Sequence, residues 1–415
     1  MADLLILNAA LSDGRTGVDI LCRDGRIAAV GPDLTAADVE RLDAGGRLVA
    51  PPFVDCHFHL DATLSLGRPR LNVSGTLLEG IALWGELKQV QTAAEIVARG
   101  LRYCEMAVGR GVLAIRSHVD VCGGMTGVEA LLELRERVAP WLDLQLVAFP
   151  QDGLFRDRGA EANLLEALDR GVGIVGGIPH FERTMEDGAA SVRRLCAIAA
   201  ERGLPVDVHC DETDDPLSRH VETLAAEALR LGLADVTASH CTSMHSMDNY
   251  YASKLIPLIA EAGVKVVANP LINITLQGRH DTYPKRRGLT RVAELRAAGV
   301  TVAFGQDCAQ DPWYPLGTGD MLEVAAMGLH VAQLTSRAGM AWCFEAVTTE
   351  PARVMALEGY GLEQGARADM VVLDAPDPVA AIRDRPARLA VIRGGRVLAR
   401  TEPARTTVRL DAAVA

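Results

Sequence analysis

Residues 51–61 read Pro-Pro-Phe-Val-Asp-Cys-His-Phe-His-Leu-Asp, an apolar run that leads into two histidines. The apolar part predicts a buried strand over Phe53–Phe58. Alternate side chains of a strand point to the same face, so the imidazoles of His57 and His59 should project together. Two neutral nitrogens at a strand end suit a divalent metal. Since either histidine could equally be a core residue, this interpretation depends on further ligands elsewhere in the chain.

The composition limits the class of protein. The chain has 415 residues, of which 49% are hydrophobic, and a net charge of -12. An acidic chain without a basic run of five residues is a poor candidate for binding nucleic acid. The nine cysteines contain no C-x-x-C pair, which predicts reduced thiols and a cytoplasmic location. The N-terminus does not resemble a signal peptide, and no apolar run reaches about 18 residues, so no membrane span is expected.

The middle of the chain alternates apolar strands with amphipathic helices, which predicts an α/β fold. Eight such repeats over roughly 300 residues favour a (β/α)8 TIM-like barrel. An open doubly wound sheet is the competing architecture, but no G-x-G-x-x-G motif follows the first strand. The predicted strands are Phe53–Phe58, Val112–His118, Asp143–Phe149, Gly173–Ile178, Pro205–His209, Val236–His240, Lys265–Asn269 and Thr301–Gly305. The predicted helices are Ala93–Ala107, Gly127–Val138, Glu161–Arg170, Ala189–Glu201, Val221–Leu231 and Tyr251–Ala262.

Both ends of the chain read as short strands separated by turns. Residues 1–50 and 361–415 are therefore expected to form one small β-sandwich domain, with the barrel of residues 51–360 inserted between them. The predicted strands are Leu4–Leu7, Val18–Cys22, Arg26–Val30 and Ala368–Leu373, with a hairpin over Leu389–Leu398 that turns at Gly394-Gly395.

Polar side chains stand at or just beyond the end of each predicted barrel strand. In barrels of this type the active site lies at the carboxyl ends of the strands, so these side chains should converge. They are His57 and His59, His118, Gln151, His180, His209, His240, Asn269 and Asp307.

Four of these residues are the expected metal ligands: His57, His59, His209 and Asp307. Three imidazoles and one carboxylate suit a single divalent ion, Fe2+ or Zn2+, with Mn2+ also possible. Such an ion would activate a water molecule at neutral pH. Glu212 and His240 are the expected acid–base residues, although a solvated acid and a buried structural histidine are the alternatives.

Several motifs extend this pattern along nearly the whole chain. Residues 51–61 resemble the amidohydrolase superfamily, and further segments resemble its bacterial cytosine deaminases. These are residues 74–81, 148–151, 208–212, 269–271, 277–279, 281–288 and 311–318. The resemblance implies a barrel with a small β-domain, one metal, oligomeric subunits, and hydrolytic loss of ammonia from a free pyrimidine base.

The resemblance also implies a role for each site residue. Gln151 would hydrogen-bond the ring carbonyl and the adjacent N–H of the base. Glu212 would protonate ring N3, while His240 and Asp307 would pass a proton from water to the leaving amine. The apolar walls around the base would be Leu77, Phe149 and Trp313.

The sequence departs from these relatives after the metal aspartate. Where they usually carry a second aspartate, this chain has Cys308, and Gln306 replaces a usual histidine. A thiol near C5 of the ring tolerates a methyl group better than a hydrated carboxylate does. Cys308 therefore predicts a 5-methylcytosine deaminase that also accepts cytosine and 5-fluorocytosine. Neutral drift at Cys308, a substrate such as isoguanine or another amino-heterocycle, and an inactive scaffold relative remain as alternatives.

Overall fold

The computed structural model describes residues 3–404 and 406–408 of the chain. The chain divides into two compact units. The larger runs from Phe53 to Tyr360, and the smaller joins the segment that ends at Pro52 to the segment that begins at Gly361.

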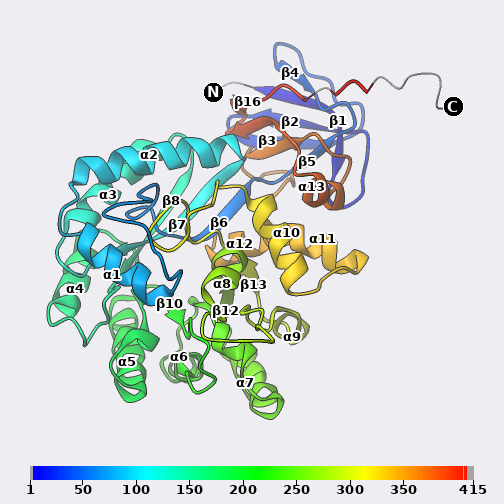
Figure 1. Cartoon of the computed structure of the whole chain (residues 1–415). Helices are drawn as coiled ribbons and strands as arrows, with labels where there is room; N and C mark the ends of the chain where they lie inside the picture. Colours follow the sequence, from blue (N-terminus) through cyan, green and yellow to red (C-terminus); the bar gives the residue numbers. More distant parts are fainter. Residues whose placement is uncertain (1–2, 405, 409–415) are drawn as a thin grey trace. The chain divides into compact units, whose positions relative to one another are not determined.

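The larger unit is built on a parallel sheet of eight strands (Figure 1). Each strand pairs with the next along the chain, as expected for a barrel rather than for a doubly wound sheet. A parallel bridge between Phe58 and Asp307 links the first strand to the segment after the last and closes the ring. The strands are β6 (Phe53–Phe58), β7 (Val112–Asp120), β8 (Asp143–Phe149), β9 (Ile174–Gly177), β10 (Val206–Cys210), β11 (Val236–His240), β12 (Lys265–Ala268) and β13 (Val302–Phe304).

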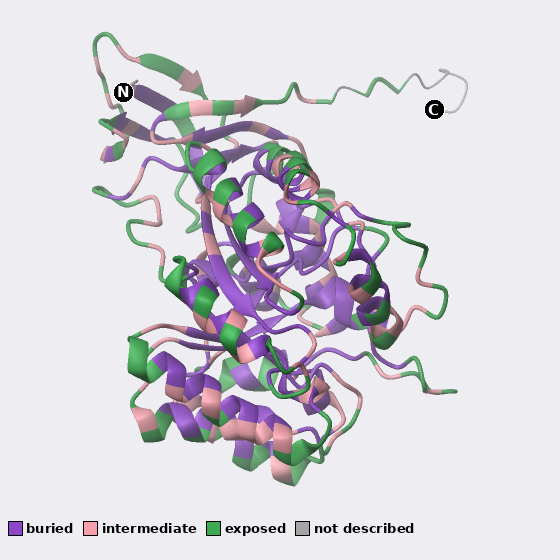
Figure 2. Cartoon of the chain, turned by 90° about the vertical axis from the view of Figure 1, so that its left-hand side faces the viewer, coloured by how far each residue is buried: buried purple, intermediate pink, exposed green. Residues whose placement is uncertain are grey.

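Helices surround these strands, with buried residues on one side and exposed residues on the other (Figure 2). The six predicted helices are all present with shifted ends. The largest shift is in α5, which starts at Met185 because the Thr184 side chain accepts a hydrogen bond from the backbone of Asp187 and caps the helix. The helices of this unit are α1 (Leu77–Leu87), α2 (Ala93–Gly109), α3 (Thr126–Val138), α4 (Ala160–Asp169), α5 (Met185–Arg202), α6 (His220–Leu231), α7 (Asn249–Glu261), α8 (Pro270–Leu276), α9 (Val292–Ala297), α10 (Met321–Val331), α11 (Arg337–Glu345) and α12 (Thr349–Val354).

The smaller unit combines strands from both ends of the chain, which confirms the predicted β-domain. Strand β1 pairs with β2 along most of its length, with β4 through its first half, and with β5 through its last two residues. Side chains from the N-terminal strands, such as Ile6 and Ile20, and from the C-terminal strands, such as Ile392, share one apolar core. The elements are β1 (Leu4–Leu11), β2 (Val18–Arg23), β3 (Arg26–Gly31), β4 (Glu40–Asp43), β5 (Leu48–Ala50), β14 (Met370–Leu373), α13 (Pro378–Asp384), β15 (Arg388–Arg393) and β16 (Arg396–Arg400).

Two further expectations concern the chain as a whole. All nine cysteines lie within the described residues, where each is buried and forms no disulfide. Among the helices that the structure describes, none is both long enough and apolar enough to cross a membrane.

Candidate metal centre and active site

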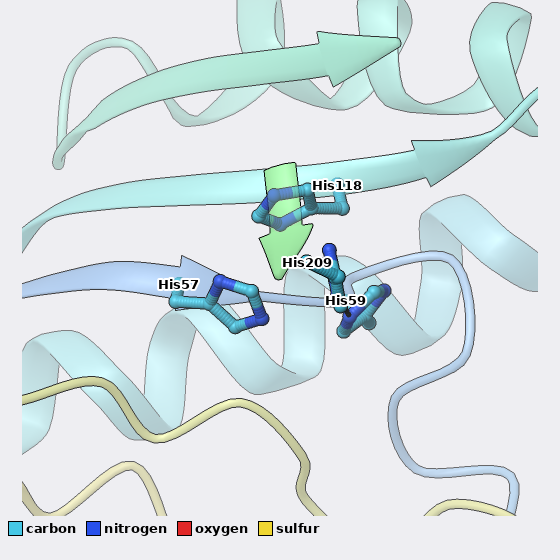
Figure 3. Close-up of side chains that lie close together, drawn as sticks. All are labelled: His57, His59, His118 and His209. Atoms are coloured by element: carbon cyan, nitrogen blue, oxygen red, sulfur yellow. Dashed lines mark hydrogen bonds between the residues drawn. The ribbon is translucent and has the colours of Figure 1, made fainter. Parts of the chain in front are cut away.

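Four histidines meet inside the barrel at the carboxyl ends of its strands (Figure 3). His57 belongs to β6, His59 follows that strand, His118 belongs to β7 and His209 belongs to β10. Each offers a ring nitrogen, and these nitrogens all lie within 4.8 Å of one another. Nε2 of His59 lies 3.2 Å from Nε2 of His209.

The chemical state of these rings fits a metal site. Burial lowers the pKa values of His57, His59 and His209, that of His59 to about 3, so the rings are neutral and carry free lone pairs. Nε2 of His57 and Nδ1 of His209 are buried and have no hydrogen-bond partner. Buried nitrogens without partners are costly unless something else satisfies them. A divalent ion coordinated by several imidazoles would do so.

Asp307 adds a carboxylate to this group. Its Oδ1 lies 3.5 Å from Nε2 of His57 and 3.5 Å from Nε2 of His59. The structure thus brings the expected ligands His57, His59, His209 and Asp307 to one place. His118 also lies within the cluster, although sequence reasoning placed it only at a strand end and did not count it as a ligand.

The two expected acid–base residues lie beside Asp307. Oε1 of Glu212 is 3.3 Å from Nδ1 of His240, and Nε2 of His240 is 3.8 Å from Oδ2 of Asp307. Burial, reinforced by the charge of Asp307, raises the pKa of Glu212 well above its usual range. A carboxyl held in its protonated form can donate a proton to a bound molecule. His240 has a φ of 69°, a strained value for a residue other than glycine, and such strain often accompanies functional sites.

A cavity opens onto these groups. The predicted substrate contacts Leu77, Gln151, Cys308 and Trp313 line it, together with His59, Ile178, His209, Glu212, His240, Ile272, Leu276 and Asp307. Phe149 is not among the lining residues. Its ring stacks on that of His209, with centroids 4.2 Å apart and planes inclined by 20°. It therefore supports a candidate ligand instead of forming a wall of the cavity.

The Cys308 side chain contributes an uncharged surface to the cavity. Burial, followed by the charges of Asp307 and Asp311, raises the pKa of its thiol well above its ordinary value. Sγ lies 3.6 Å from Oδ1 of Asp307. The thiol therefore stays protonated and presents a small, weakly polar group next to the carboxylate.

A series of buried hydrogen bonds holds the His57 ring in place. Ser239 Oγ lies 2.9 Å from Nδ1 of His57 and donates to Oδ1 of Asp207 over 3.0 Å. The other carboxylate oxygen of Asp207 accepts from Nη1 of Arg116 over 2.9 Å. Supporting hydrogen bonds of this type orient an imidazole for metal binding. Sequence reasoning missed Arg116, Asp207 and Ser239, because nothing in the local pattern distinguishes them from other strand residues.

The family profile described as the amidohydrolase family matches residues 40–399. The chain belongs to the amidohydrolase family. This amidohydrolase is 42% identical to the 5-methylcytosine deaminase of Klebsiella pneumoniae, solved with 5-fluorocytosine, with a TM-score of 0.95 over 97% of this chain and 99% of that one. The same enzyme solved with phosphonocytosine gives 41% identity and a TM-score of 0.93, covering 98% and 100% of the two chains.

Two further relatives of this amidohydrolase carry different names. N-isopropylammelide isopropyl amidohydrolase of Pseudomonas sp. (strain ADP) is 31% identical, covering 96% of this chain and 98% of the relative. Pterin deaminase of Rhizobium rhizogenes (strain K84) is 32% identical, covering 94% and 90%. All of these names refer to nitrogen heterocycles.

Proposed function

We propose that this amidohydrolase removes the exocyclic amine of free pyrimidine bases, with 5-methylcytosine as the preferred substrate. Water and the base would yield thymine and ammonia. Cytosine and 5-fluorocytosine would be accepted as well. The observation that carries the proposal is the protonated Cys308 thiol in a small cavity beside Glu212 and Asp307. The likeness to a 5-methylcytosine deaminase over nearly the full length of both chains supports it.

His57, His59, His209 and Asp307 would hold one divalent metal, Fe2+ or Zn2+, with Mn2+ as a further possibility. Such a metal supplies Lewis acidity that makes water a nucleophile near neutral pH. His118 lies close enough to the same nitrogens to be considered as an additional ligand. The neutral state of the buried imidazoles supports this assignment, because a protonated ring cannot coordinate.

The remaining residues would bind the base and move protons. The Gln151 amide would donate to the ring carbonyl and accept from the adjacent N–H, which fixes the base in its plane. Glu212 would give its proton to ring N3 as water attacks C4. One proton of that water would restore Glu212, and His240 and Asp307 would pass the other proton to the amine, which leaves as ammonia. Leu77 and Trp313 would cover the faces of the ring.

Cys308 would decide the preference at C5. A methyl group next to a carboxylate would displace water from the charge, which is costly. Against a protonated thiol the same methyl gains contact, and burying one methyl group is worth about 0.8 kcal/mol. A hydrophobic pocket discriminates a single methyl group by about 1–3 kcal/mol.

The test is ammonia release by the purified, metal-loaded protein from a panel of bases assayed side by side. The panel contains 5-methylcytosine, cytosine, 5-fluorocytosine and isoguanine, with pterin and N-isopropylammelide included because relatives carry those names. The proposal expects 5-methylcytosine to give a kcat/KM at least equal to that of cytosine. A higher kcat/KM for pterin or for a triazine would show that the substrate is not a pyrimidine base. Absence of ammonia release from every compound would favour an inactive scaffold.

Three accompanying predictions need separate measurements. Elemental analysis of the purified protein identifies the bound metal. Light scattering tests the prediction of a homo-oligomer. The cytoplasmic location stays a prediction for cell fractionation to test.

A further inference from the structure

The backbone of Gln151 is hydrogen-bonded to the buried carboxylate of Asp120. Oδ1 of Asp120, which ends β7, accepts hydrogen bonds from the backbone N–H groups of Cys122 over 2.7 Å and of Gln151 over 3.4 Å. The carboxylate of Asp61 in turn accepts from the backbone N–H of Asp120 over 2.9 Å. The position of Gln151 at the cavity therefore depends on where Asp120 is held.

Lys88 holds Asp120 and also the residue that follows Gln151. Its Nζ lies 2.8 Å from Oδ2 of Asp120 and 2.5 Å from Oδ2 of Asp152. Only 9% of its side chain is exposed. Burial by itself would lower the pKa of Lys88, but the two carboxylates outweigh that effect and raise it, so the ammonium stays charged. One cation thus ties together the two carboxylates that flank the Gln151 backbone.

Lys88 also connects these two carboxylates to the apolar wall of the cavity. It directly follows α1, the helix that begins with Leu77. Trp84 of the same helix donates from Nε1 to Oδ2 of Asp120 over 2.7 Å, and its ring centroid lies 6.2 Å from that of Trp313. Lys88 therefore links the polar contact expected for the base with the helix that carries part of the apolar wall.

We propose that Lys88 is a positioning residue for base recognition, which acts by fixing Gln151 through Asp120 and Asp152. The inference rests on the proposed function, because it assumes that Gln151 binds the base. Lys88 would not touch the substrate or the metal ligands. An interaction that Gln151 makes equally with the bound base and with the transition state changes KM and leaves kcat unchanged.

The experiment compares Lys88→Met and Lys88→Arg with the wild-type holoenzyme on 5-methylcytosine. We expect Lys88→Met to raise KM by about tenfold or more, since misplacing a contact by one ångström can cost up to about 10²-fold. kcat should stay within about threefold, and the metal content should match that of the wild type. Lys88→Arg should recover most of the loss, because a guanidinium can also bridge two carboxylates.

Lys265→Met is the matched control. Lys265 starts β12 at the opposite end of the strands, and its Nζ lies 2.8 Å from Oδ1 of Asp235, so the variant also removes a lysine–aspartate pair. It should leave KM unchanged. An unchanged KM in Lys88→Met, or a fall in kcat accompanied by metal loss, would overturn the positioning role.

A second variant decides the matter if Lys88→Met does not fold. Asp152→Ala removes a carboxylate that is one-third exposed and leaves the Lys88–Asp120 pair in place. It should raise KM by about threefold, and no change in KM would overturn the proposal. Failure of the proposed function can be told apart from failure of this inference. In the first case the wild-type protein itself would release ammonia from none of the bases.

Discussion

The backbone N–H of Asp307 donates a hydrogen bond to the carbonyl oxygen of His57 over 2.8 Å. The same contact forms part of the bridge that closes the barrel. Asp307 adopts a φ of 66° there, a left-handed conformation that costs about 1–3 kcal/mol for such a residue. The contact that closes the barrel therefore also places the Asp307 carboxylate beside the histidines.

Replacing Asp307 should test this connection. We expect Asp307→Ala to lose both the bound metal and turnover, because a carboxylate beside two imidazoles is removed. Elemental analysis and ammonia release measure the two effects. Removing the metal from the wild type with a chelator should reproduce the loss of turnover, and adding Fe2+ or Zn2+ should restore it. An Asp307→Ala protein with a full complement of metal would show that Asp307 is not a ligand.

Glu212→Gln should separate chemistry from metal binding. The amide cannot give up a proton to ring N3, so turnover should fall by about 10²–10⁴-fold, the usual size of a general acid–base contribution. The metal content should stay at the wild-type level, because Glu212 is not an expected ligand. Turnover close to that of the wild type would remove Glu212 from the mechanism.

Cys308→Asp should move the preference from 5-methylcytosine towards cytosine. The ratio of the two kcat/KM values should change by about tenfold or more, as expected for discrimination of one methyl group. Cys308→Ala is the matched control, because it removes the thiol without adding a charge and should keep the preference for the methylated base. If Cys308→Asp leaves the ratio unchanged, then residue 308 does not recognise C5, although the deaminase function could still hold.

Cytidine should be a poor substrate compared with the free bases. In the proposed orientation of the base, the Gln151 side chain, which lines the cavity, occupies the N1 side of the ring, so a ribose on N1 would collide with it. We expect a kcat/KM for cytidine at least about 10²-fold below that for cytosine, measured as ammonia release. Comparable turnover of the two would mean that Gln151 does not face the N1 side of the base.

Arg116→Met should destabilise the fold. Arg116 is 1% exposed and pairs with Asp207, so its removal leaves a buried carboxylate without its cation. Breaking a buried pair in this way costs about 3–5 kcal/mol of unfolding free energy, measurable by urea denaturation. Arg137→Met is the control, because Arg137 pairs with Glu133 on the surface of α3, where such pairs are worth about 0.5 kcal/mol or less. Equal midpoints for the two variants would contradict the prediction.

The barrel was predictable because its strands are buried on both faces and therefore read as apolar runs. The predicted bounds of β6, β8 and β11 agree with the observed ones. The short strands β4 and β5 were missed, since four and three residues carry too little pattern. The convergence of side chains at the strand ends followed from the known geometry of such barrels.

The parts of the site that were missed depend on contacts between distant residues. Arg116 and Asp207 are 91 positions apart, and Lys88 and Asp120 are 32 apart, so no local pattern encodes either pair. The resemblance to cytosine deaminases implied that Phe149 would form an apolar wall for the base. Its ring packs on His209 instead, a placement that depends on how β8 and β10 are arranged in three dimensions.

The smaller unit has a consequence for how the protein is made. Strand β5 pairs with β14, and Ala50 and Val371, which face each other, are separated by roughly 320 residues. At about 5–20 residues per second, the ribosome needs tens of seconds to supply that partner after β5 has emerged. During this time one edge of β5 stays unpaired, and open edges of this kind recruit strands from other chains. A message that ends before Met370 should therefore yield an aggregating product even where the entire barrel has been translated.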